Sequence, residues 1–185
     1  PWYRGAPDGA MEAESGALCA VVREELLPRP FSIALDCHSG FGLRDRIWFP
    51  HAHTRAPFAR LAEVHALACG FAGLYPGHPY VFEPQCRQYL THGDLWDFLC
   101  AQAPPAATFL PLTLEMGSWR WISKSPRQAL SRLGIFNPLP PDRLARVRRN
   151  HLLWMAYLCR AAQTWRDWVP SGADRDRHER RGRAA

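Results

Sequence analysis

The sequence predicts an α/β fold, a β-sheet with flanking helices, and three observations favour it. Short apolar runs of strand length, such as residues 31–36, alternate with longer segments whose apolar residues recur at helical spacing, such as residues 57–71. Prolines and glycines separate the two kinds of segment. Hydrophobic residues make up 47% of the 185 residues, so the chain can bury a core of domain size. Alternation of helices and strands around one core is typical of α/β proteins.

The first half of the chain is predicted to contain two helices and one strand. Residues 11–27 are expected to be helical, because acidic side chains occupy the first turn and apolar residues form a stripe. Prolines end this helix, and the run FSIALD at residues 31–36 follows as a short strand. A long loop is expected over residues 39–56, and the next helix over residues 57–71. Residues 72–93 are rich in glycine, proline and aromatic residues, and no regular structure is expected there.

The second half is predicted to contain three helices and one strand. A short helix at residues 95–103 precedes the strand TFLPLTLEMG at residues 108–117. Residues 125–136 form the next helix, with a proline at its first position. A long helix at residues 140–168 then closes the domain, which we expect to span residues 1–168.

The charge distribution bears on the partners of the chain. The net charge of +6 lies entirely in residues 141–185, which contain 11 arginines and five acidic residues. We expect residues 169–185 to be a basic, disordered tail. The tail mixes both signs of charge, and it lacks the aromatic residues or reader motif that nucleic-acid binding calls for. No apolar run is long enough to span a membrane. The sequence therefore predicts neither a nucleic-acid partner nor a membrane location.

Cysteine usage and the chain start bear on the compartment. Six cysteines are scattered through the chain, and no two have Cys-x-x-Cys spacing. Scattered cysteines in a chain of this length act mostly as small apolar residues, which favours a reducing, cytoplasmic location. The chain begins at Pro1 and its first methionine is Met11, so we expect its natural start to lie upstream.

Each of the two predicted strands ends in a polar side chain. Side chains alternate along a strand, so Asp36 and His38 share one face at the carboxyl end of the first strand. Ligands bind at such ends in open α/β sheets, and a carboxylate beside a histidine orients it for metal binding. A loop histidine satisfied by hydrogen bonds is the alternative. Glu115 ends the second strand, either as a surface residue or as a buried carboxylate with a partner, suited to general acid–base work.

Three motifs, in this order, resemble the zinc carboxypeptidase family of the carboxypeptidase A type over residues 30–120. His38 and Ser39 in DCHS match the third zinc ligand of that family and the serine after it. The spacing of its substrate-clamping loop is matched by Tyr89, Gly93, Asp97 and Phe98. Glu115 in LTLEMG matches its glutamate, and the phrase DCHSGFGLRDRIWFP is similar to a bacterial branch of the family.

This resemblance implies a mixed sheet of the phosphorylase/hydrolase-like type and a catalytic Zn²⁺ with three protein ligands, one of them His38. Glu115 would take a proton from zinc-bound water, which attacks the scissile carbonyl, and would pass the proton to the leaving amine. Tyr89 would close over the substrate, a peptide cleaved at its C-terminal bond. Trp96 would line the side-chain pocket and favour an apolar or small side chain, whereas a slip of one residue would place Asp97 there.

The chain departs from the family in lacking the His-x-x-Glu motif that supplies the first two zinc ligands. None of the eight histidines is followed by glutamate three positions later, and the family's substrate-binding Asn-Arg pair is not recognisable. We therefore expect the chain to be the C-terminal part of a longer enzyme. Arg44 and Arg46, with Ser39, are candidates for substrate binding through the free carboxylate. Two alternatives stay open: a deacylase of N-acyl amino acids, of the aspartoacylase or succinylglutamate desuccinylase type, and a truncated binding domain without activity.

His51 and His53 form a His-x-His pair whose imidazoles share one face of an extended segment. Such pairs bind metal in some barrel amidohydrolases, but that fold needs about 250 residues and eight strand–helix units. A second interpretation places one of these histidines with Asp36 and His38 in a self-contained metal site.

Overall fold

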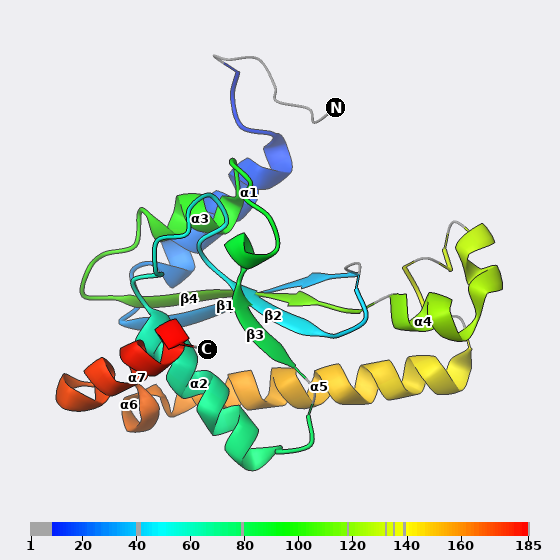
Figure 1. The fold of residues 1–185 in the computed structure, drawn as a ribbon. Coiled ribbons are helices and arrows are strands. Elements are labelled where there is room, and N and C mark those ends of the chain that lie inside the picture. Colours follow the sequence, from blue (N-terminus) through cyan, green and yellow to red (C-terminus); the bar gives the residue numbers. More distant parts are fainter. Residues whose placement is uncertain are drawn as a thin grey trace.

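The computed structural model has a four-stranded sheet with helices on both faces (Figure 1). It confirms the predicted α/β class, with a mixed sheet and flanking helices. The residues described are 9–39, 42–78, 80–117, 119–131, 133–134, 136–138 and 140–184. The helices are α1 (Ala13–Val21), α2 (Leu61–Leu74), α3 (Leu95–Cys100), α4 (Trp119–Lys124), α5 (Pro141–Gln163), α6 (Trp165–Trp168) and α7 (Gly172–Ala184). The strands are β1 (Phe31–His38), β2 (Arg46–Phe49), β3 (Val81–Pro84) and β4 (Thr108–Glu115).

The sheet joins strands that are far apart in sequence. Its order is β1-β4-β2-β3, so β4 stands between the first two strands of the chain. β1 and β4 are parallel, β2 is antiparallel to β4, and β3 is parallel to β2. The carboxyl ends of β1 and β4 therefore meet the start of β2 at one end of the sheet.

Two apolar clusters cover the two faces of the sheet, and Figure 1 shows α2 and α5 on one side and α1 and α3 on the other. The larger cluster joins alternate sheet residues to α2 and α5, and its buried members include Phe31, Ile47, Phe49, Leu67, Phe71, Leu110, Leu112, Leu114, Trp154 and Leu158. The smaller cluster, beneath α1 and α3, contains Cys19, Val22, Leu27, Leu99 and Phe109. Because side chains alternate along a strand, Asp36, His38 and Glu115 face α1 and α3.

The sequence predicts no strand in residues 39–56 or 72–93, but β2 and β3 lie there. Each has only four residues, which is too few for an alternation of apolar and polar side chains to stand out. In β2, Ile47 points into the larger cluster, while Arg46 and Trp48 share the face of their cross-strand partners in β4.

The predicted C-terminal helices are shorter than expected. Among the described residues of the range 125–136, the structure has a 3₁₀ turn at Pro126–Leu130 in place of an α-helix, and the proline stands at its first position. The long helix predicted over residues 140–168 is divided at Thr164 into α5 and α6. α5 still packs one side against the sheet, since Trp154 is fully buried in the larger cluster.

The sequence predicts a disordered tail over residues 169–185, but Gly172–Ala184 form helix α7, which packs against α2. Arg175 of α7 forms an ion pair with the buried carboxylate of Glu63 in α2. Gly182 lies so close to Leu61 that an added Cβ would come within 3.0 Å of the leucine Cγ. The charged composition suggested disorder, but one of these arginines is the partner that a buried carboxylate needs.

All six cysteines are free thiols. Two of them, Cys19 and Cys86, are buried, whereas Cys37, Cys69 and Cys159 are exposed. Among the described residues, no helix has both the length and the apolar character needed to cross a membrane.

Candidate functional site

His38 and Glu115 lie side by side where β1 and β4 end. The two strands pair in parallel, and their register sets His38 opposite Glu115. Nδ1 of His38 lies 3.1 Å from Oε1 of Glu115, and Nε2 lies 3.0 Å from Oδ2 of Asp36. One imidazole therefore bridges two carboxylates from neighbouring strands. The structure thus brings together the three polar residues that the sequence pattern places at strand ends.

The two ends of this contact differ in their access to solvent. The side chain of Glu115 is only 11% exposed, whereas that of His38 is 50% exposed. Glu115 is therefore a buried carboxylate with a partner, and the alternative of an exposed strand end is wrong. A molecule that approaches from solvent reaches His38 first and finds the Glu115 carboxylate directly behind it.

The two carboxylates hold His38 in its protonated form when no metal is bound. The hydrogen bond to Asp36, followed by the one to Glu115, raises the pKa of His38 to about 10. In return, the hydrogen bond from His38 lowers the pKa of Asp36, and a hydrogen bond from Trp96 adds to this effect. At neutral pH both ring nitrogens of His38 therefore donate protons.

Trp96 fixes the position of Asp36 from the helix above. Its indole Nε1 donates to Oδ2 of Asp36 at 3.1 Å, while its ring packs against Phe109 at a centroid distance of 6.4 Å. The helix that holds it, α3, begins at Asp94, whose side chain accepts a hydrogen bond from the Asp97 backbone N–H and caps the first turn. Trp96 thus presents its polar edge to the site, and its role as a pocket wall stays a prediction.

Arg46 starts β2 directly opposite Glu115 but binds a different carboxylate. Its Nε donates to Oε1 of Glu83 at 2.9 Å, and its Nη1 donates to the carbonyl of Arg44 at 3.3 Å. The indole of Trp48 donates to the same Glu83 oxygen at 3.2 Å. A substrate carboxylate at Arg46 would therefore compete with Glu83.

The remaining predicted substrate-binding residues lie around this end of the sheet, where β1 and β4 end and β2 begins. Tyr89 is 54% exposed and packs edge-on against Trp48, with ring centroids 6.0 Å apart. Partial burial, and then the negative charge of Glu115, raise the pKa of the Tyr89 phenol. Ser39 follows β1 and is half-buried, and the side chain of Arg44 is exposed. These positions are compatible with substrate contacts, and their roles stay predictions.

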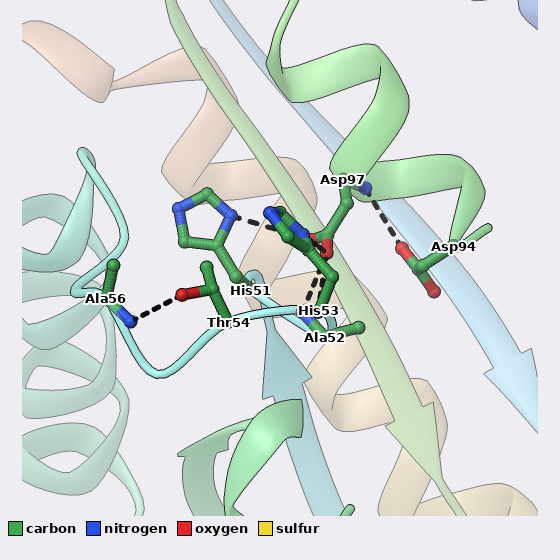
Figure 2. Close-up of polar contacts among 7 residues, drawn as sticks. All are labelled: His51, Ala52, His53, Thr54, Ala56, Asp94 and Asp97. Atoms are coloured by element: carbon green, nitrogen blue, oxygen red, sulfur yellow. Dashed lines mark hydrogen bonds and ion pairs between the residues drawn. The ribbon is translucent and has the colours of Figure 1, made fainter. Parts of the chain in front are cut away.

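His51 and His53 lie on the loop after β2, and both face Asp97 of α3 (Figure 2). Nδ1 of His53 lies 2.5 Å from Oδ2 of Asp97, and Nδ1 of His51 lies 3.7 Å from Oδ1. Their partner is thus Asp97, rather than Asp36 and His38. The His-x-His spacing signalled the pair, but no local pattern shows that α3 packs over this loop.

The described residues contain two groups of three whose ligand atoms all lie within 4.8 Å of one another. One is His51, His53 and Asp97, and the other is His65, Cys69 and His178. His38 belongs to neither. It fits a metal as a single ligand, because Asp36 orients its Nε2 while its Nδ1 faces Glu115.

Comparisons with family models, with curated proteins and with solved structures find no significant match to this chain. Its function has therefore to be argued from its own residues.

Proposed function

We propose that this chain belongs to a zinc-dependent hydrolase of the carboxypeptidase type, with His38 as a zinc ligand and Glu115 as the general base. The observation that supports the proposal is the pairing of these two side chains. They occupy matching positions at the ends of adjacent parallel strands, with Nδ1 of His38 3.1 Å from Oε1 of Glu115. Metal-assisted hydrolysis requires a general base close enough to the metal ligand to reach the metal-bound water, and these two side chains are direct neighbours.

Asp36 is the residue that orients the ligand. Its contact with Nε2 of His38 leaves Nδ1 for the metal, as in the carboxylate–histidine–zinc arrangement of many zinc sites. Zinc would replace the proton on Nδ1, because a ligating imidazole has to be neutral there. A catalytic zinc site needs three protein ligands, so the proposal requires two more from protein outside these 185 residues. When bound, the ion supplies Lewis acidity and lowers the pKa of a coordinated water.

Glu115 moves the proton in this proposal. It accepts a proton from the attacking water and delivers it to the leaving amine, so the amide bond breaks without a free amide anion. Its burial to 11% exposure keeps bulk water away from the carboxylate. Tyr89, on the exposed rim next to Trp48, would close over the bound substrate.

The substrate in this proposal is a peptide with a free C-terminal carboxylate. Exposed Arg44 and half-buried Arg46 are the cations near the edge of the sheet that suit this carboxylate. Trp96 favours an apolar C-terminal side chain. The free thiols suit a reducing compartment such as the cytoplasm.

The first test is Glu115→Gln in the full-length protein, assayed with an N-acylated dipeptide and with an N-acyl amino acid. We expect kcat to fall about 10²–10⁴-fold while the zinc content stays unchanged, because the amide cannot accept a proton. Glu63→Gln is the control, since Glu63 is also a buried carboxylate but lies on α2, which covers the opposite face of the sheet. Unchanged turnover in Glu115→Gln would refute the role of Glu115. Hydrolysis of the N-acyl amino acid alone would make the enzyme a deacylase.

A further inference from the structure

The loop that connects β2 to α2 brings two imidazoles to one carboxylate. His51 and His53 are two residues apart, and both rings face Asp97 of α3 (Figure 2). Their ring centroids are 5.4 Å apart. The ligand atoms of all three residues lie within 4.8 Å of one another.

Asp97 is fixed in place before any ligand arrives. It is 8% exposed, and its Oδ2 accepts hydrogen bonds from the backbone N–H groups of Ala52 at 2.9 Å and His53 at 3.0 Å. The Nδ1 of His53 lies 2.5 Å from the same oxygen. Three contacts therefore converge on Oδ2 and hold the carboxylate in one orientation.

The other carboxylate oxygen faces a second buried atom, and neither has a hydrogen-bond partner among the described residues. These atoms are Oδ1 of Asp97 and Nδ1 of His51, 3.7 Å apart. Buried polar atoms normally find a partner, so the pair needs an explanation. An imidazole nitrogen and a carboxylate oxygen at this distance are suitably placed to share a cation.

We propose that His51, His53 and Asp97 bind a divalent transition metal, with Zn²⁺ as the reference ion, at a site separate from His38 and Glu115. Zinc at about 2.0–2.1 Å from each ligand places neighbouring ligand atoms about 3.4 Å apart. The separation of 3.7 Å between His51 and Asp97 is close to this value. Two imidazoles with one carboxylate suit zinc, copper or nickel rather than calcium or magnesium.

Metal binding changes one contact in this site. The ion would replace the proton shared between His53 and Asp97, so that Nδ1 of His53 moves away from Oδ2 to a ligand–ligand distance. The side chain of His53 is 45% exposed, which gives the ring room to move and leaves the solvent side open for a water ligand. An ion there would tie the loop to α3, the helix that holds Trp96 against Asp36.

The group of His65, Cys69 and His178 is the comparison site. Its two imidazoles contact each other, with 2.8 Å between the two Nδ1 atoms, and Cys69 is exposed. Neither histidine contains a buried nitrogen without a partner among the described residues. The group therefore lacks the buried ligand atoms without partners that distinguish His51 and Asp97.

The test is titration of the metal-free chain with Co²⁺, whose visible absorption reports ligand geometry, followed by competition with Zn²⁺. Three forms are compared: wild type, the double variant His51→Asn/His53→Asn, and the control His65→Asn/His178→Asn. Both substitutions in the first variant leave the backbone bonds of Asp97 in place. We expect the wild type and the control variant each to bind one equivalent of Co²⁺ at His51, His53 and Asp97. Their Co²⁺ absorption spectra should be the same. The first variant should lose that spectrum and bind at least tenfold more weakly.

Circular dichroism and thermal unfolding without metal show whether each variant is folded, and His38→Ala should leave this binding unchanged. Equal binding by wild type and His51→Asn/His53→Asn overturns the proposal, as does a wild type that binds no Co²⁺. Loss of binding only in His65→Asn/His178→Asn also overturns it, because the ion would then lie between α2 and α7.

Discussion

His38 donates hydrogen bonds from both ring nitrogens, to Asp36 on its own strand and to Glu115 on the neighbouring strand. Two anions around one imidazole favour its cation, so a metal has to displace a proton that is held tightly. A metal ion at Nδ1 would therefore have to bind strongly, because its binding would remove the proton that holds His38 in ion pairs with Asp36 and Glu115. In the proposed function, Asp36 would then orient His38 and Glu115 would act as the general base.

A residue-scale prediction concerns the pKa of His38 in the metal-free chain. NMR titration of the His38 ring should give a pKa near 10 in the wild type. Asp36→Asn should lower it toward the ordinary value of about 6.5, because the largest cause of the raised pKa is removed. A wild-type pKa of His38 near 6.5 would contradict the geometry described here.

The raised pKa of His38 makes the free energy of unfolding depend on pH. The folded form of His38 binds its proton more tightly than the unfolded chain does, so this contribution to the free energy of unfolding is complete below pH about 6.5. It is lost as the pH rises toward about 10. Since the side chain is half exposed, solvent screens both contacts and reduces this contribution.

At the residue scale, alternation along two strands was enough to predict the core of the candidate site. Residues 31–38 and 108–115 each have one apolar face, which leaves His38 and Glu115 together on the other face. The engagement of Arg46 by Glu83 could not be predicted, because it depends on the pairing of β2 with β3, and neither strand has a recognisable pattern.

At the element scale, helix α7 shows how a charged segment becomes ordered. The carboxylate of Glu63 is 2% exposed in α2 and contacts Arg175 of α7 and, at 3.8 Å, Arg60. The hydrogen bond from Arg175 to the carbonyl of Ala59 adds a second anchor at 3.0 Å. Local composition cannot reveal such an anchor, because the partner lies more than a hundred positions earlier in the chain.

An element-scale prediction follows for Arg175→Ala. Removal of this guanidinium leaves the buried Glu63 carboxylate with Arg60, at 3.8 Å, as its remaining ion-pair partner among the described residues, so we expect a loss of about 1–3 kcal/mol in the free energy of unfolding. Urea denaturation measures the loss, and hydrogen exchange should show faster exchange in α7. Arg177→Ala is the control on the same helix, where the side chain is 54% exposed, with an expected change within about 0.5 kcal/mol. Equal effects of the two substitutions would show that Arg175 does not anchor α7.

At the scale of the whole molecule, the two faces of the sheet have different roles. The face under α2 and α5 holds most of the apolar core, whereas the face under α1 and α3 has a smaller apolar cluster and a row of polar side chains at one end. Those polar residues stand where β1 and β4 end and β2 begins. Figure 1 shows that the chain leaves β4 toward α4 at this same end. The larger cluster thus stabilises the sheet mainly from one side, and the polar residues lie at one end of the other side.

The sequence could predict this division of the sheet only in part. The α/β class and the two long strands follow from periodicity, whereas the strand order depends on β4 inserting between β1 and β2, which no local pattern encodes. The grouping of His51, His53 and Asp97 could not be predicted for the same reason, because α3 and the loop after β2 meet only once the sheet has formed.

The most direct measurement of the central claim is anomalous diffraction at the zinc absorption edge from crystals of the zinc-loaded full-length protein. The proposal predicts a peak about 2.0–2.1 Å from Nδ1 of His38, with the carboxylate of Glu115 on the adjacent strand end. A peak beside His51, His53 and Asp97 would be the second ion. Zinc-loaded crystals without a peak at His38 would contradict the claim that this histidine is a zinc ligand.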